Sequence, residues 1–205
     1  MDCAGVCSGA SSVDDCGECD DTVTTDCILA YDVELDEGAN LISFYALPED
    51  HSVSNIFNGA DAVIGQGVGA VNINDTWIGS LTEVSDDDGY WVKVSEATTL
   101  HLGESEPVSY DSDGEVSYSI HYGNNLISYP FQTSQDLGDA LGDVAAYIYA
   151  VAGQGIAALN AGTELGGEDG WAGSLTAFEG GNGYWLVSTN EDGFNFNFNG
   201  VADGL

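Results

Sequence analysis

An internal duplication constrains the fold of this chain more than any other feature of the sequence. Four short blocks occur twice in the same order, and the spacing between the two copies grows only from 85 to 94 residues. Such recurrence indicates a duplicated structural unit with small loop insertions in the second copy. The paired blocks are residues 40–44 with 125–129, 65–68 with 153–156, 77–82 with 171–176, and 89–94 with 183–188.

The duplication divides the chain into four parts. We expect a cysteine-rich head at residues 1–30, a first β module at 31–104, an acidic linker at 105–116 and a second β module at 117–205. Alternating apolar and polar residues predict strands with one solvent-facing side, joined by Gly, Asp and Asn turns. Residues 40–47 are expected to form a more buried strand, and residues 77–84 another strand after a turn at Asn74 and Asp75. The predicted fold class is mainly β, with two tandem small sandwich-like or barrel-like modules after a head with little regular structure.

One short helix is expected in each module. In the first, residues 49–52 supply possible N-caps for a helix through Val53, Ile56 and Phe57. In the second, Ser134 is the expected cap, with Leu137 and Leu141 on one face of the helix. Ser and Asp favour this position because their side-chain oxygens accept hydrogen bonds from the first free backbone N–H groups.

The chain is strongly acidic, with 35 Asp and Glu residues against one base, Lys93, and a formal net charge of −34. Such a surface repels nucleic-acid phosphates and anionic membranes, so we expect no nucleic-acid partner. No apolar run approaches the roughly 20 residues of a membrane span, so no membrane insertion is expected. Solubility in a salty medium explains the charge most simply, and bound calcium is a compatible second explanation.

The cysteines are confined to the head, which has no hydrophobic periodicity. A disulfide framework is favoured there over a zinc site, because the spacing is irregular for tetrahedral zinc and cross-links can order a short segment that lacks a core. Since five is an odd number, one thiol is left over, either free or bonded to another chain. The five residues are Cys3, Cys7, Cys16, Cys19 and Cys27.

The head resembles a known cysteine repeat, on the residues DCAGVCSG at 2–9 and DCGEC at 15–19. This repeat, often grouped with thrombospondin type 3-like sequences, is abundant in surface proteins of marine bacteria and structural proteins of marine phages. The modules resemble a repeat unit of the same proteins through NLISFYALPED at 40–50 and GYWVKV at 89–94. The second copy lacks the Leu-Pro-Glu-Asp segment. The resemblance implies a surface location and a repeat architecture, and it carries no catalytic activity.

No catalytic constellation is visible, and we expect a protein that is not an enzyme. The three histidines, His51, His101 and His121, have no ligand spacing, and Arg is absent. Acyl or phosphoryl transfer would have to stabilise negative charge within a field of carboxylates. Glycoside hydrolysis needs only a pair of carboxylates and therefore stays open as a weak third possibility.

Acidic clusters are the hypothetical calcium sites, because calcium prefers clustered oxygen ligands. The linker has the D-x-D-G opening of a calcium loop, a predicted hairpin tip carries three consecutive Asp residues, and the head adds a pair. No other cofactor is expected. The residues are Asp111, Asp113 and Glu115 in the linker, Asp86, Asp87 and Asp88 at the hairpin tip, and Asp14 and Asp15 in the head.

The four tryptophans are the remaining functional candidates. Trp77, Trp91, Trp171 and Trp185 all belong to the duplicated blocks, so packing in the core or between modules is favoured. Stacking on sugar rings is the alternative if their faces are exposed. Three glycines at Gly65, Gly67 and Gly69 indicate close backbone approach or a bulge rather than a phosphate loop, because no strand-to-helix context surrounds them.

Together these features predict a non-enzymatic structural or decoration protein on a virion surface, assembling with copies of itself or with other virion proteins. The N-terminus has neither the basic region nor the apolar core of an export signal. Disulfide-forming cysteines in a chain without an export signal suit a virus particle, because its proteins reach the oxidising exterior when the host cell lyses. The alternative is an extracellular or cell-surface bacterial module for adhesion or glycan binding, stabilised by calcium.

Overall fold

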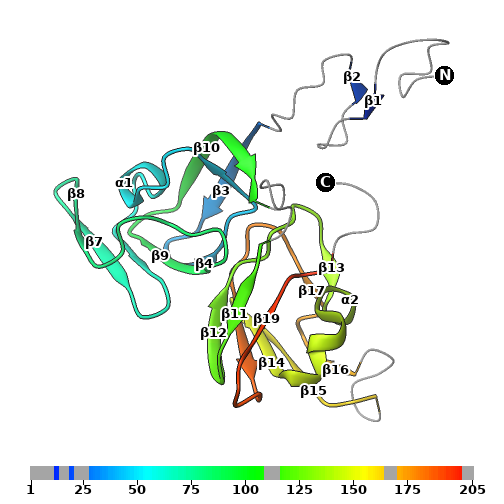
Figure 1. The fold of residues 1–205 in the computed structure, drawn as a ribbon. Coiled ribbons are helices and arrows are strands. Elements are labelled where there is room, and N and C mark those ends of the chain that lie inside the picture. Colours follow the sequence, from blue (N-terminus) through cyan, green and yellow to red (C-terminus); the bar gives the residue numbers. More distant parts are fainter. Residues whose placement is uncertain (1–11, 14–18, 21–27, 109–115, 164–169, 200–205) are drawn as a thin grey trace.

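The computed structural model describes residues 12–13, 19–20, 28–108, 116–163 and 170–199. Their antiparallel sheets form two groups, one in each duplicated half, and the predicted mainly β fold is confirmed. We call residues 28–108 module 1 and residues 116–199 module 2. In Figure 1, module 1 runs from blue to green and lies above module 2, which runs from yellow-green to red.

Module 1 contains a five-stranded sheet, a three-stranded sheet and one short helix, α1 (Val53–Ile56). The five-stranded sheet has the order β4-β9-β6-β7-β8, with β4 at one edge. Its strands are β4 (Gly38–Ile42), β9 (Tyr90–Val94), β6 (Ala62–Ile64), β7 (Gly69–Ile73) and β8 (Thr76–Gly79). The three-stranded sheet comprises β3 (Leu29–Leu35), β10 (Thr98–Pro107) and β5 (Ala46–Pro48).

Module 2 repeats this plan with the order β12-β18-β14-β15-β16, and β12 is an edge strand as β4 is. These strands are β12 (Gly123–Ile127), β18 (Tyr184–Ser188), β14 (Ile148–Gly153), β15 (Ile156–Asn160) and β16 (Trp171–Gly173). Two strand pairs and two short helices complete it. They are β11 (Tyr118–Ile120) with β19 (Phe194–Phe196), β13 (Gln135–Asp136) with β17 (Ala177–Phe178), α2 (Leu137–Leu141) and η2 (Gly142–Tyr147). In the head, β1 (Ser12–Val13) pairs with β2 (Cys19–Asp20).

The recurring Tyr-Trp strands show why the sequence folds this way. In β9, Tyr90, Val92 and Val94 are buried while Lys93 points outward, as the alternation predicts. The equivalent β18 follows the same pattern. The buried tyrosines keep their hydroxyls paired: the backbone N–H of Ser85 donates to Tyr90 Oη, and that of Glu179 donates to Tyr184 Oη. Burial raises the pKa of Tyr90, and it raises the pKa of Tyr184 to about 12.

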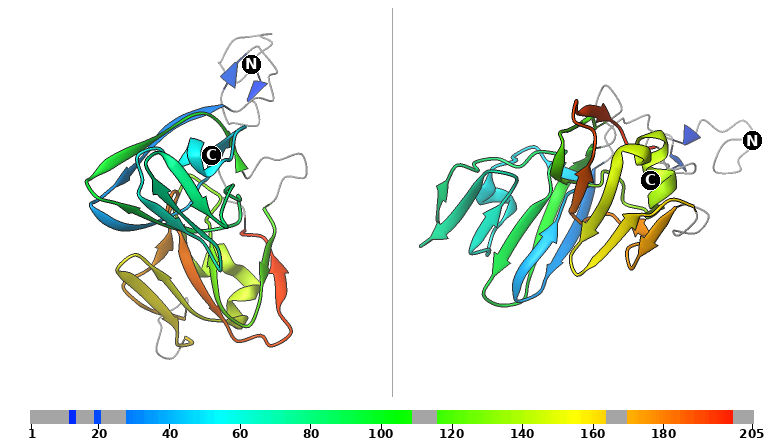
Figure 2. Two further views of the ribbon diagram at one scale, coloured as in Figure 1. Left: turned by 90° about the vertical axis from the view of Figure 1, so that its left-hand side faces the viewer. Right: turned by 90° about the horizontal axis from the view of Figure 1, so that it is seen from below.

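The buried side chains form one hydrophobic cluster that runs through both modules. Phe44 and Tyr129, which occupy equivalent positions in the two copies, are both fully buried. In module 2 the ring of Tyr129 stacks on Phe178 with centroids 5.5 Å apart. Figure 2 shows the two modules side by side, and the continuous core makes them one packed unit.

Four local predictions need correction. The strand expected at residues 40–47 ends at Ile42 and resumes at Ala46, because Ser43 pairs with module 2. The strand expected at 77–84 ends at Gly79. Ser134 is not the cap of the second helix, which begins after Asp136. Strand β10 continues to Pro107, into the expected linker, because its end pairs with β5. No helix in the described ranges is both long and apolar enough to cross a bilayer.

Candidate functional site

The duplicated residues meet at the junction between the two modules, where they make matching contacts. Two isolated β-bridges cross it, one between Ile42 and Asn182 and the other between Ile127 and Asp88. Ile42 corresponds to Ile127, and Asn182 corresponds to Asp88, in the two copies. The junction therefore has approximate two-fold symmetry within one chain.

A glutamine from each module reaches the edge strand of the other. The Leu126 backbone N–H donates to Gln66 Oε1 at 2.6 Å, and the Leu41 N–H donates to Gln154 Oε1 at 2.7 Å. Each glutamine stands between two glycines in the turn that links the second and third strands in chain order of its five-stranded sheet. Edge strands carry backbone groups that have no partner within their sheet, so each glutamine satisfies a donor that would otherwise remain unpaired.

Two buried serines extend the symmetric junction. The Ser43 backbone N–H donates to the Gly181 carbonyl at 2.9 Å, and the Ser128 N–H donates to the Asp87 carbonyl at 3.1 Å. Their hydroxyls donate to the carbonyls of Asn182 and Asp86, at 2.7 and 2.6 Å. Both serines are completely buried and fully satisfied, which is what a polar group inside a protein requires.

Two recurring glycines permit the modules to approach. A Cβ on Gly89 would lie 2.8 Å from the Ile127 carbonyl oxygen, and one on Gly183 would lie 2.6 Å from the Ile42 carbonyl oxygen. The obstructing atoms belong to the backbone and cannot move aside cheaply. The other module therefore lies too close for any residue but glycine before each Tyr-Trp pair.

The recurring asparagines hold the turn that leads into each edge strand. Asn40 accepts from the Asp36 backbone N–H and donates to the Asp36 carbonyl, at 2.9 and 2.8 Å. Asn125 makes the same pair of bonds with His121, at 3.0 and 2.9 Å. Every polar residue of the recurring Asn-Leu-Ile-Ser block therefore has a structural role.

One side of the junction is acidic and the other is not. A cleft of about 240 Å³ lies between the modules, and its lining includes Gln66, Asp87, Asp88 and His121. Partial burial and the neighbouring carboxylates of Asp87 and Asp86 raise the pKa of Asp88 to about 6. At the equivalent position on the other side stands Asn182, which is uncharged.

His121 belongs to the same cleft, and its hydrogen bonds define its neutral tautomer. Its Nδ1 lies 2.8 Å from the Tyr122 carbonyl oxygen and must donate to it. Its Nε2 lies 2.6 Å from Gln66 Nε2, so the ring accepts a hydrogen bond from the glutamine amide. Gln66 thus contacts the backbone of Leu126 and Asn124 and the side chain of His121 in module 2.

No calcium site can be assigned among those predicted calcium-binding residues that the structure describes. Within the described ranges, no group of three or more His, Cys, Asp and Glu side chains is arranged to hold a metal ion. Asp86, Asp87 and Asp88 line the junction, where the Ser85 hydroxyl donates to the Asp87 carboxylate. Calcium binding stays a prediction. The other residues proposed for it lie outside the described part of the chain: Asp14, Asp15, Asp111, Asp113 and Glu115.

The disulfide prediction concerns the head. The side chain of Cys19, in β2, and residues Cys3, Cys7, Cys16 and Cys27 are likewise outside what the structure describes.

The four tryptophans separate into two kinds of position. Trp171 is buried at 8% exposure, and Trp77 is partly buried against the core, with its ring 6.4 Å from that of Phe57. Trp91 and Trp185 are partly exposed. Each lies on the face of its five-stranded sheet that is opposite to Trp77 and Trp171 respectively. Core packing thus accounts for Trp171 and in part for Trp77.

The opposite face of the module 1 sheet, here called the outer face, lacks carboxylates at every strand position. Ile64, Val71, Ile73 and Ile78 are 45–57% exposed there, and Lys93 is the chain's one basic residue. The ladder pairs Lys93 with Ala62, Ala62 with Val71, and Val71 with Ile78. The strand positions of this face are Ala39, Leu41, Ala62, Ile64, Gly69, Val71, Ile73, Thr76, Ile78, Trp91 and Lys93.

The sheet of module 2 presents a similar surface. Trp185 pairs with Ala152, and Ala150 pairs with both Val187 and Leu159. Leu159 is 46% exposed and pairs with Ala172. These strand positions also lack charged side chains.

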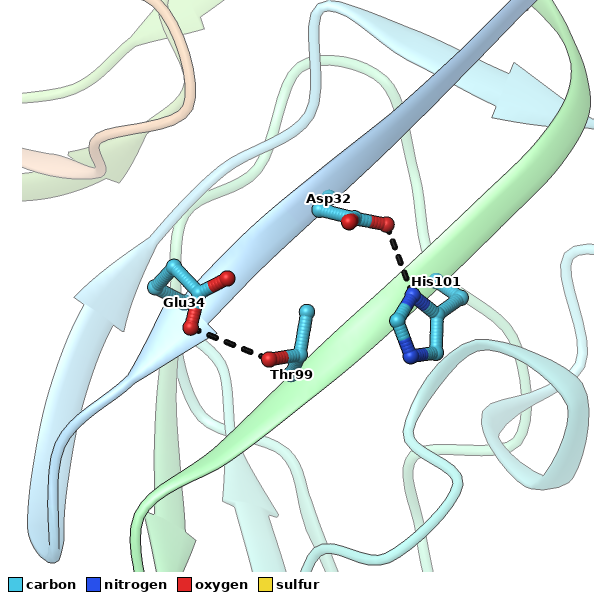
Figure 3. Close-up of polar contacts among 4 residues, drawn as sticks. All are labelled: Asp32, Glu34, Thr99 and His101. Carbon is cyan, nitrogen blue, oxygen red and sulfur yellow. Dashed lines mark hydrogen bonds and ion pairs between the residues drawn. The ribbon is translucent and has the colours of Figure 1, made fainter.

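A histidine and an aspartate form an exposed pair on the three-stranded sheet (Figure 3). His101 Nδ1 lies 2.7 Å from Asp32 Oδ1, and beside them the Thr99 hydroxyl donates to Glu34. The side chains of His101 and Asp32 are 77% and 58% exposed. They face each other across β3 and β10 as cross-strand neighbours, and exposed pairs of this kind contribute little to stability.

Helix α1 and the β7–β8 hairpin lie at the end of module 1 that is far from module 2 (Figure 1). Residues of these elements line a second cleft, of about 380 Å³. Its lining is polar except for the ring of Trp77. Asn74 and Asp75 form the two-residue turn of the hairpin, with φ angles of 50° and 62°. Trp77 was a candidate from the sequence, whereas none of the amide and carboxylate groups around it was.

Comparison with known proteins found no matching family, no similar curated protein and no similar solved structure. The internal duplication is therefore the comparison that identifies which residues recur, and it points to the junction between the modules.

Proposed function

We propose that this protein is a non-enzymatic structural protein of a virion surface, where it assembles with copies of itself through the outer face of module 1. The observation that carries the proposal is the composition of that face. In a chain with 35 acidic residues, a sheet surface of five strands has no carboxylate and exposes four large aliphatic side chains.

A cluster of exposed apolar side chains on one sheet face is typical of an interaction site in soluble proteins. The charge of the chain argues for a second copy as the occupant. Lys93 lies within the outer face, and the acidic remainder of the chain offers carboxylates to pair with it. The rest of the acidic surface would keep assembled particles apart in solution. The fold supports a structural role because two of its buried polar residues, Ser43 and Ser128, bond across the junction between the modules.

The test is the assembly state of the full chain, measured by sedimentation velocity and negative-stain microscopy in 0.5 M NaCl, a salt level at which the Debye length is only about 4 Å. We expect the wild-type protein to form ordered oligomers. The double variant Ile64→Asp with Ile78→Asp should remain monomeric, because it places two carboxylates on the outer face.

The matched control carries Ile28→Asp and Tyr122→Asp, which add the same charge at exposed positions outside the outer face. It should assemble like the wild type. A wild-type protein that stays monomeric at all concentrations would contradict the proposal, and so would undiminished assembly of the outer-face variant. Parallel runs with calcium and with a chelator test the calcium hypothesis.

A further inference from the structure

We propose that the cleft beside Trp77 binds a neutral saccharide. This inference does not depend on the proposed assembly, because the cleft lies between α1 and the β7–β8 hairpin and Trp77 belongs to the core-facing side of the sheet. The volume of about 380 Å³ lies within the range of small-molecule sites and is of the order of one or two sugar rings.

Trp77 forms the apolar wall of the cleft. Its ring packs against Phe57 on one side, which fixes its orientation, and its remaining surface lines the cavity. An aromatic ring held in this way offers a flat surface for the C–H groups of a pyranose, and its indole N–H is available as a donor.

The duplicated module supplies an internal comparison. Trp171 occupies the equivalent position in module 2 and is buried at 8% exposure. In module 1 only the two residues Asn74 and Asp75 separate β7 from β8, whereas residues 161–170 separate β15 from β16. The short turn therefore accompanies the open tryptophan, and among the described residues the open cleft is found beside Trp77 of module 1.

The other walls are built from amides and carboxylates. Within the described ranges, the side chains of Asn58, Asn74 and Asp75 make no hydrogen bond to the protein. Asp61 accepts from the Ser95 hydroxyl at 2.6 Å, and Asn72 donates to the Ala60 carbonyl at 3.3 Å. Sugar hydroxyls both donate and accept, so they suit a ring of groups that includes both donors and acceptors.

The turn is also fixed before any ligand arrives. Asn74 and Asp75 adopt left-handed backbone angles, which Asn and Asp tolerate better than other residues with a Cβ, and these angles suit a tight hairpin turn. Their side chains are therefore presented from a rigid element, which lowers the entropic cost of binding.

Charge selects the class of saccharide. Two carboxylates, Asp61 and Asp75, line the cleft, and the whole chain carries a net charge of −34. Uronic acids, sulfated sugars and sialic acids would be repelled. The absence of aliphatic side chains from the lining argues against an apolar ligand, so a neutral sugar fits best.

The test is titration of the full chain with maltose, cellobiose, lactose and N,N′-diacetylchitobiose, each up to about 20 mM, a concentration that reveals even millimolar dissociation constants. Binding is followed by calorimetry and saturation-transfer NMR, and we expect at least one of the sugars to bind. The exposed substitutions Asn58→Ala and Asp75→Gly should each weaken binding about tenfold, as expected for the loss of one good hydrogen bond, and glycine keeps the left-handed backbone angle at position 75. Both residues lie on the surface, so these variants should fold.

Trp77→Phe keeps the contact with Phe57 and should weaken binding without unfolding the protein. Trp185→Phe, on the far face of the other module, is its matched control and should leave binding unchanged. The proposal is overturned if none of the four sugars binds, if a heparin disaccharide binds more tightly than the neutral sugars, or if binding is lost in Trp185→Phe and kept in Trp77→Phe.

Discussion

The side-chain oxygen of Gln66, in module 1, accepts a hydrogen bond from the backbone N–H of Leu126, at the edge of the module 2 sheet, across 2.6 Å. Its duplicate, Gln154, makes the same bond to Leu41 in the opposite direction. Each half of the chain thus blocks the edge strand of the other. The contacts of the two glutamines differ, because Gln66 also donates to His121 and to the Asn124 carbonyl, whereas Gln154 has neither kind of partner in the described contacts.

Removing the glutamines should weaken the junction unequally. Gln154→Ala loses one hydrogen bond from the backbone N–H of Leu41 and should lower the free energy of unfolding by about 1 kcal/mol. Gln66→Ala loses the contacts with His121 and Asn124 as well and should cost more, about 1–2 kcal/mol. Urea unfolding at pH 7 measures both. Gln132→Ala, at an exposed position with no described side-chain hydrogen bond, is the control. Equal stabilities for all three variants would argue against the role assigned to the glutamines.

The junction glycines should tolerate no side chain. Gly89→Ala and Gly183→Ala would each force a Cβ to within 2.8 Å of a backbone oxygen of the other module, so the modules must move apart. We expect a loss of about 1–3 kcal/mol for each, typical of overpacking a tight contact. Gly103→Ala meets no atom within 4 Å and should be almost neutral. Thermal unfolding followed by tryptophan fluorescence distinguishes the variants, and a neutral Gly89→Ala would count against the close approach of the modules.

Asp88→Asn should change how stability depends on pH. The pKa of Asp88 is about 6 in the folded protein, against an ordinary aspartate value of 3.8 when the chain is unfolded. A raised folded pKa means that ionising Asp88 destabilises the fold, fully above about pH 6 and not at all below about pH 4. The variant should therefore be more stable than the wild type at pH 7.5, with the difference vanishing near pH 4.

Asn already stands at the equivalent position in module 2, so the substitution suits this backbone. Asp143→Asn removes the same charge from outside the junction and corrects for the general relief of repulsion. Urea unfolding of the three proteins at pH 7.5, 6, 5 and 4 gives the comparison. A wild type to Asp88→Asn difference that is the same at every pH would refute the assignment.

The modules and most of their strands could be predicted from the sequence because each depends on short-range patterns. Alternation around Tyr90 and Val92 correctly predicts a half-buried strand, and the apolar residues Val53 and Ile56 correctly predict a short helix. The break in the expected strand after Ile42 could not be predicted in this way. Ser43 leaves the sheet to bond with Gly181, and nothing within one module records that partner.

The junction could not be predicted for a related reason. Gly65 and Gly67 indicate close backbone approach within a strand pair, yet the feature that matters is the exposed Gln66 between them. The signal in the sequence that could have indicated the junction was a polar residue that recurs at an exposed turn in both copies. The aromatic ring of Trp77 is evident in the sequence, but the polar cleft depends on how α1 and the β7–β8 hairpin come together, which follows from the fold.

The two-fold junction also limits how a larger structure could grow from this chain. In a symmetric contact between two equivalent halves, each half occupies the binding surface of the other. A third half cannot be added through the same surface, so the contact cannot propagate into a filament. Here both halves belong to one polypeptide, so the contact is saturated as soon as the chain folds. The junction of a folded molecule is already occupied, so any larger assembly must form through other surfaces.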